Sequence, residues 1–238
     1  MPANPFLVAF EHCATDVVHA LPNNIDSARA NTVIEDLLHE VHTSHTKLYA
    51  IVKIICDWAI ADEERGPSAI CLFHALLVAT PETIFDNSIE DRRTGGYVCG
   101  SALCRKYLLN YCQWNFEMLL DSTAWTAGLL RLLAGFATTG LTTLRINIYI
   151  IERLSTSEHI FCGHNLERFV AFVSDAGPSL DRNEIRKREL TQDLGALMVR
   201  AANQPLAKRV YVDGLILFRE NGWRLAAADT GRGGVTSQ

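Results

Sequence analysis

Apolar side chains recur every three to four residues along most of this chain after residue 30, which is the period of an amphipathic helix. One stripe comprises Val33, Ile34, Leu37, Leu38 and Val41, and the next comprises Leu48, Ile51, Val52, Ile55, Trp58 and Ala59. These two stripes predict a helical hairpin. A second hairpin is predicted after Gly66-Pro67, and its second helix is expected to open at Pro81 and to carry Ile84, Phe85 and Ile89.

The clearest helical pattern covers residues 101–121, behind a glycine-rich loop at 95–100. One face of this helix is apolar and carries Cys104, Tyr107, Leu108, Tyr111, Cys112, Met118 and Leu119. The opposite side forms a polar stripe, which consists of Lys106, Asn110, Gln113 and Glu117.

The most apolar stretch, residues 129–151, contains Arg131 and Arg145 and a Gly-Thr centre, so it predicts two buried helices joined by a turn instead of a membrane span. Its β-branched end, 146–151, would also suit a strand. Further on, Gly177-Pro178 is expected to stop a helix, and Asp181 with Glu184 to cap the next one. The last helix should begin after Pro205 and stop at 221–222.

These segments amount to about ten helices in pairs of about 40 residues, the spacing of helical-repeat proteins. The predicted fold is all-α: a HEAT/armadillo-like solenoid of about five antiparallel hairpins over residues 31–224. Residues 1–30 are predicted to be weakly ordered, and residues 225–238, with glycines at 231, 233 and 234, to form a flexible tail.

The net charge of −5 does not fit a basic nucleic-acid binder, but the charge is unevenly distributed. Residues 1–64 hold three basic and ten acidic side chains, whereas residues 182–209 hold seven basic and three acidic ones. The basic cluster is either a solvated face or a weak, non-specific contact for RNA phosphates, through Arg182, Arg186, Lys187, Arg188 and Lys208.

Candidate catalytic and metal chemistry is sparse in this sequence. The seven cysteines form no Cys-x-x-Cys pair, and His39, His42 and His45 point in different directions on a helix, so we expect no metal, no cofactor and no catalytic residue. Adjacent cysteine and histidine residues leave a small cytosolic hydrolase as a rival hypothesis. The chain start lacks a basic n-region, and the expected location is the cytoplasm or the nucleus, with neither a membrane nor a small-molecule substrate as a partner.

A family resemblance goes further, and it rests mainly on the run Gly100-Ser-Ala-Leu-Cys-Arg-Lys-Tyr-Leu-Leu-Asn-Tyr-Cys-Gln-Trp-Asn-Phe-Glu117. This run resembles a helix of the middle domain of eukaryotic translation initiation factor 4 gamma. Two weaker segments fit in the same order: Ala176-Gly-Pro-Ser-Leu-Asp181, and the closing run from Arg209 to Trp223. The family's Gly-Glu pair is replaced by Ile148-Tyr149, so the chain resembles a divergent member.

The resemblance implies a crescent of stacked helical hairpins that binds a DEAD-box RNA helicase of the initiation complex, contacts RNA and catalyses nothing. On this basis the expected helicase-binding residues are Lys106, Asn110, Gln113, Glu117, Arg209, Asp213 and Trp223. Three alternatives stay open beside it: a middle-domain relative acting in mRNA decay, one acting in nuclear cap binding, and a degenerate paralogue that folds but binds nothing.

Overall fold

The computed structural model describes residues 4–91 and 94–224, of which 74% are helical. The elements are α1 (Pro5–His19), α2 (Ser27–Val41), α3 (His45–Ala61), the 3₁₀ turn η1 (Glu63–Arg65), α4 (Gly66–Ala79), β1 (Phe85–Glu90), β2 (Tyr97–Cys99), α5 (Gly100–Leu120), α6 (Ala127–Thr139), α7 (Leu144–Thr156), α8 (Asn165–Asp181), α9 (Glu184–Ala201) and α10 (Leu206–Glu220). The prediction of an all-α fold is confirmed. The tail predicted at 225–238 lies outside the described residues.

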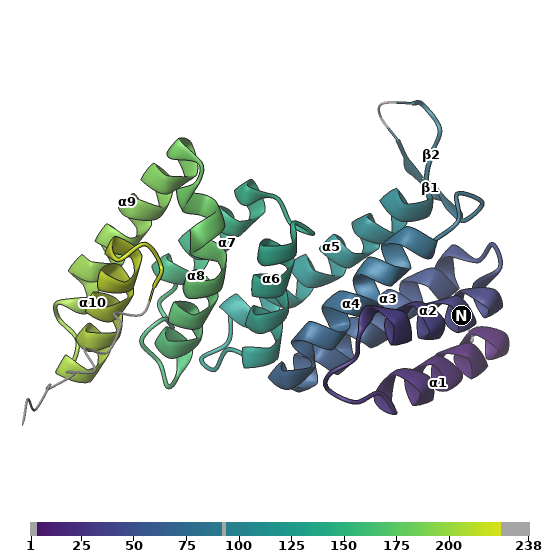
Figure 1. Ribbon diagram of the computed structural model, residues 1–238, viewed down its shortest axis with the longest axis horizontal. Coiled ribbons are helices and arrows are strands. Elements are labelled where there is room, and N and C mark those ends of the chain that lie inside the picture. Colours follow the sequence, from purple (N-terminus) through teal and green to yellow (C-terminus); the bar gives the residue numbers. More distant parts are fainter. Residues whose placement is uncertain (1–3, 92–93, 225–238) are drawn as a thin grey trace, which may run out of the picture.

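Each helix packs mainly on helices one and two places away along the chain. The principal next-but-one pairs are α1 with α3, α2 with α4, α3 with α5, α4 with α6, α6 with α8, α7 with α9, and α8 with α10. The resulting molecule is elongated, with α1 to α4 at one end and α9 and α10 at the other (Figure 1). A continuous apolar core runs along it, and its largest fully buried side chains include Trp58, Trp125, Phe73 and Phe136.

The stretch 129–151 contributes to two helices, α6 and α7, as predicted. Gly140 ends α6 in the left-handed conformation at φ 74°, and the Thr143 hydroxyl caps the start of α7. The residues 146–151 are helical, not extended, because Ile148, Ile150 and Ile151 are all buried between helices. Within the part of the chain that the structure describes, no helix is both long and apolar enough to span a membrane.

Residues 4–30 differ from the prediction of a weakly ordered segment at 1–30, whose first three residues lie outside the described part of the chain. Asn4 caps α1, and the buried side chains of Phe10, Ala14 and Val18 repeat every fourth residue on the side that packs against α3. The Asp26 carboxylate then caps α2 by accepting a hydrogen bond from the Arg29 amide at 2.7 Å. α1 is stabilised because α3 covers its apolar stripe, a contact that local spacing does not reveal.

The helix predicted after Pro81 is wrong, because β1 and β2 form an antiparallel hairpin there. The hairpin projects from the helical body beside the start of α5 (Figure 1). Ile84 is buried before the first strand, and the Phe85 ring stacks on Tyr97 of the other strand with ring centroids 6.0 Å apart. Cross-strand contacts of this kind stabilise a sheet. The apolar residues whose spacing predicted a helix therefore pack in and beside a strand instead.

The predicted helix stop at Gly177-Pro178 is also wrong, since α8 continues through both residues to Asp181. Proline removes one hydrogen-bond donor and crowds the preceding turn. The buried side chains of Ala176 and Leu180 nevertheless hold this segment against the core. The next helix is capped by the side chain of Asn183, not by Asp181, which has a different role described below.

Candidate functional site

The polar stripe of α5 is accessible, as its spacing predicts. Lys106, Asn110 and Gln113 are exposed, and Glu117 is half-buried because its carboxylate lies 3.5 Å from the Tyr149 hydroxyl and 4.0 Å from the Arg153 guanidinium. Met118, expected on the apolar face, is 57% exposed instead. The first three stripe side chains make no hydrogen bond or ion pair with another side chain among the described residues.

An apolar pocket of about 180 Å³ lies next to the stripe, between α5, α6 and α7. Gln113 stands at this pocket, whose other lining residues are Leu109, Cys112, Phe116, Leu133, Thr142, Ile146, Tyr149 and Ile150. The stripe therefore borders a surface with a polar rim and an apolar floor, which is the usual composition of a protein–protein contact.

On the other side of the stripe, α3 and α5 form an aromatic recess, defined here as Tyr49, Tyr111 and Trp114. It borders a cavity of about 570 Å³ that Lys53 and Asn110 also line. The Tyr111 hydroxyl donates a hydrogen bond to the Asp57 carboxylate at 2.5 Å. Burial, together with this carboxylate, raises the pKa of Tyr111 well above its ordinary value, so the phenol stays neutral.

Sequence reasoning placed Tyr111 in the core and did not single out Tyr49 or Trp114. The sequence did contain a sign that Trp114 is exposed, because Trp114 follows Asn110 by four residues and therefore lies on the same side of the helix. The contribution of Tyr49 comes from another helix and has no local signature.

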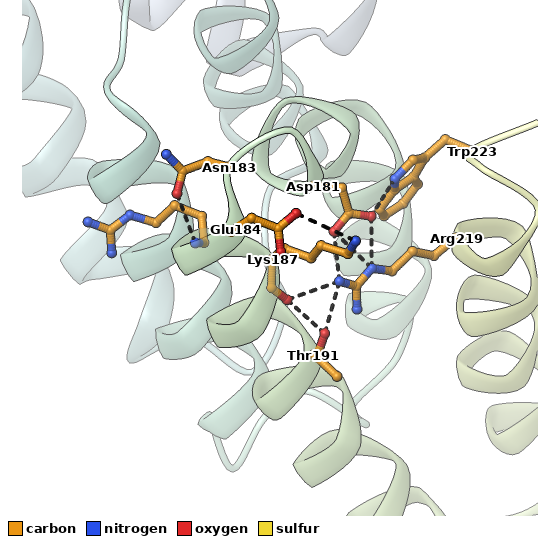
Figure 2. Close-up of polar contacts among 8 residues, drawn as sticks. Asp181, Asn183, Glu184, Lys187, Thr191, Arg219 and Trp223 are labelled. Atoms are coloured by element: carbon orange, nitrogen blue, oxygen red, sulfur yellow. Dashed lines mark hydrogen bonds and ion pairs between the residues drawn. The ribbon is translucent and has the colours of Figure 1, made fainter.

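At the other end of the molecule, Asp181 lies at the centre of a polar cluster that joins α8, α9 and α10 (Figure 2). Its two carboxylate oxygens accept hydrogen bonds from the Arg219 guanidinium at 2.7–3.1 Å, and Oδ2 also accepts one from the Trp223 indole at 2.8 Å. The guanidinium further donates to the Lys187 carbonyl and the Thr191 hydroxyl, both at 3.0 Å. We call Asp181, Arg219 and Trp223 the C-terminal clamp.

Trp223 therefore has a structural role that the sequence left open. A Cβ atom on Gly177 would lie 2.2 Å from the Trp223 ring, so α8 carries a glycine where the indole packs, and the ring also contacts Phe218 edge-on. The indole is half-buried. Arg219, which lies in the closing run of the resemblance but was not among the expected site residues, provides most of the clamp's hydrogen bonds.

Arg209 and Asp213 are exposed on the first half of α10. Trp223 lies beyond the other end of this helix, which ends at Glu220, about 16 Å along the axis from Arg209 at 1.5 Å per residue. The expected helicase-binding residues thus lie in separate places: the stripe on α5 and the closing helix at the C-terminal end (Figure 1).

The structure does not assemble the five basic residues expected to bind RNA into one patch. Lys208 lies at the start of α10, where it contacts the Glu167 carboxylate at 3.5 Å and the Gly163 carbonyl at 2.5 Å. Arg186 and Lys187 lie at the opposite end of the α9–α10 hairpin. Antiparallel packing separates Lys208 from the others.

Two of the remaining charges are partly neutralised by their own helix. Arg186 pairs with Glu189 at 2.6 Å, and Lys187 lies 4.0 Å from Glu184. Arg182 and Arg188 are exposed and form no ion pair with a described residue. They are the charges most available to a phosphate.

Between α7 and α9, Arg145, Glu152, Arg186, Glu189 and Asp193 line a cavity of about 390 Å³. Burial raises the pKa of Asp193 to about 6, with a further contribution from the nearby carboxylates of Glu152 and Glu189. This carboxyl group titrates close to neutral pH.

The cysteines of the described residues are all free, and burial raises the pKa of Cys104 to about 12 and that of Cys56 well above its ordinary value. Both are therefore protonated at neutral pH. In the described ranges, no group of three or more histidine, cysteine, aspartate or glutamate side chains is placed to hold a metal ion.

No protein-family model matches this chain, and no curated protein sequence matches it either.

Proposed function

We propose that this chain is a non-catalytic scaffold in mRNA translation initiation, a HEAT/armadillo-like solenoid of helical hairpins that binds a DEAD-box RNA helicase and, weakly, RNA. The proposal rests on the resemblance of residues 100–117 to the middle domain of initiation factor 4 gamma. The observation that carries it is that the polar residues of this run, Lys106, Asn110 and Gln113, are exposed and unpaired among the described residues. These side chains do not pack in the core, so they are available for contact with a partner.

Two further observations support the proposed solenoid. Next-but-one packing of helices, from α1 with α3 to α8 with α10, is what stacked hairpins require. In addition, the two weaker segments of the resemblance meet in space, because Asp181 of the first accepts hydrogen bonds from Arg219 and Trp223 of the second.

Helicase binding is tested with purified cytosolic DEAD-box helicases, by pull-down and by stimulation of their ATPase activity. A Lys106→Glu/Gln113→Glu variant that keeps its helical circular dichroism should bind about tenfold or more weakly, since a desolvated interfacial charge typically contributes more than 1 kcal/mol. Arg29→Glu, an exposed charge reversal on α2, is the matched control and should bind as wild type.

Two outcomes separate the alternatives. If the wild-type chain binds no cytosolic helicase but binds one from nuclear or decay complexes, the chain is a middle-domain relative of that process. If it binds none of them, the degenerate paralogue is the correct interpretation and the proposal is wrong.

RNA binding is tested separately, with a single-stranded oligonucleotide over a range of salt concentrations. We expect weak binding that weakens steeply with salt. An Arg182→Glu/Arg188→Glu variant should abolish it, whereas Arg209→Glu, at the other end of the hairpin, should leave it unchanged. Binding that persists in the double variant would show that the cluster is a solvated face.

A further inference from the structure

The aromatic recess has the form of a site for a cation. Tyr49 is 40% exposed and Trp114 is 58% exposed, whereas Tyr111, whose ring is near both of theirs, is 8% exposed. The ring centroid of Tyr111 is 6.3 Å from that of Tyr49 and 6.0 Å from that of Trp114. Three rings therefore border one cavity of about 570 Å³, to which Asn110 adds an amide.

The hydrogen bonds behind these rings favour a positive ligand. Tyr111 donates its hydroxyl to Asp57, and Tyr107, whose ring meets Tyr49 edge-on at 5.3 Å, donates its hydroxyl to Asp86 at 2.7 Å. A phenol that donates to a carboxylate becomes more electron-rich, because hydrogen bonds to charged groups polarise the donor. An electron-rich ring face attracts a cation more strongly.

The rest of the molecule offers a contrast. Three other aromatic rings already have a basic side chain above them: Lys47 over Phe10 at 4.9 Å, Arg65 over Trp58 at 5.4 Å, and Arg200 over Phe161 at 5.6 Å. Among the described residues, no basic side chain covers a ring of the aromatic recess in this way. Lys53 lines the same cavity, but its ammonium is paired with the Asp57 carboxylate at 2.7 Å.

The charge of the surroundings selects among possible ligands. The charged residue that lines the cavity, Lys53, lies near two carboxylates, Asp57 and Glu11, which together raise its pKa. These two negative charges outnumber the one positive charge, which favours a basic protein segment over the phosphates of RNA. A planar guanidinium stacks on aromatic faces and offers five donors, whereas an ammonium is a compact point charge. The Asn110 amide oxygen at the cavity is an available acceptor for one of these donors.

We propose that the aromatic recess of Tyr49, Tyr111 and Trp114 binds an arginine side chain presented by a protein partner. The site does not require that this partner be a helicase. Its test contains no helicase, so its failure and the failure of the proposed function are separate results.

The experiment is a titration of the ¹⁵N-labelled chain with three short peptides of alternating residues: Arg-Gly, Lys-Gly and Gln-Gly repeats of equal length. The four tryptophans give four indole N–H signals, and a Trp114→Phe variant identifies that of Trp114. We expect the arginine peptide to shift this signal at low millimolar concentration or below, the lysine peptide to bind several-fold more weakly, and the glutamine peptide to leave it unchanged.

Two variants give the proposal its sharpest test. Tyr49→Ala should weaken binding of the arginine peptide about fivefold or more. Tyr97→Ala, which removes another exposed ring, on β2, is the matched control and should leave binding unchanged. Lys53→Met should strengthen binding about threefold, because it removes a competing cation and frees the Asp57 carboxylate.

Three results would overturn the proposal. Equal binding of the glutamine peptide would mean non-specific adsorption on the rings. The absence of any shift of the Trp114 signal with the arginine peptide would mean that the recess is not a cation site. A shift with oligouridylate that Lys53→Met weakens would identify a stacking surface for RNA bases instead.

Discussion

Replacing Asp181 by alanine should destabilise the C-terminal end of the molecule more than any exposed ion-pair mutation. The Asp181 and Arg219 side chains are only 19% and 14% exposed, and the substitution removes three close contacts to the guanidinium together with the acceptor for the Trp223 indole. Arg219 keeps two acceptors, the Lys187 carbonyl and the Thr191 hydroxyl, so its charge is not left wholly uncompensated.

The magnitude follows from this geometry. Removing one partner of a buried ion pair lowers the free energy of unfolding by about 3–5 kcal/mol. Each buried N–H that loses its acceptor accounts for about 1 kcal/mol or more of this decrease. Because some solvent reaches the clamp and two acceptors remain, we expect the low end, about 3 kcal/mol of the free energy of unfolding. For a chain of this size this corresponds to a decrease of roughly 6–12 °C in Tm.

The assay is urea unfolding followed by circular dichroism, with amide hydrogen exchange to localise the loss to α9 and α10. Asp175→Ala is the matched control, because it breaks an ion pair of the same 2.7 Å length whose partners are 51% and 38% exposed, and it should cost less than about 1 kcal/mol. If both substitutions cost the same, burial does not decide the strength of the clamp and the reasoning is refuted.

Three other predictions test separate features. Gly177→Ala should displace the Trp223 ring, costing about 1–3 kcal/mol and moving the tryptophan fluorescence toward that of exposed indole; an unchanged spectrum and stability would contradict the packing described. Asp193→Asn should stabilise the fold by about 1 kcal/mol at pH 7.5, a value reduced because the group is only half-buried. At pH 4 it should stabilise the fold by almost nothing, since the destabilisation by Asp193 develops as the pH rises from about 4, the pKa in the unfolded chain, and is complete above the folded pKa of about 6. Glu35→Gln, an exposed change on α2, is its control in the same thermal unfolding series and should show no such pH dependence. In thiol labelling at pH 8, the exposed Cys13 should react first, and the buried cysteines only on unfolding, namely Cys56, Cys104 and Cys112; rapid labelling of a buried cysteine would contradict its burial.

Helical periodicity predicted most of the fold. It anticipated the helices of 129–151 and the exposure of Lys106, Asn110 and Gln113, because side chains three and four residues apart share one side of a helix. It failed at Ile84 and Phe85. These residues have a helix-like spacing, but they lie at the start of β1, which pairs with β2 across a turn. It also failed at Gly177-Pro178, where burial on either side outweighs the local tendency to stop the helix.

The side-chain clusters could not be derived in the same way. Asp181 and Arg219 lie 38 residues apart in the sequence, and Asp57 and Tyr111 lie 54 apart. Local spacing carries no information about such pairs, since each depends on how two helices are placed by the core. The sequence drew attention to Asp181 as a helix cap, and the family resemblance drew attention to Asp181 and Trp223, but neither paired the two residues with each other.

The packing of each helix on helices a few places before it also bears on how the chain reaches its native state. Contacts between elements close in sequence require short loop closures, so the relative contact order is low and folding is expected to be fast. A nascent chain emerges from its N-terminus first. α3 can cover α1, and α4 can cover α2, while α9 and α10 are still being synthesised, so the N-terminal end can bury its apolar surface before the C-terminal clamp exists.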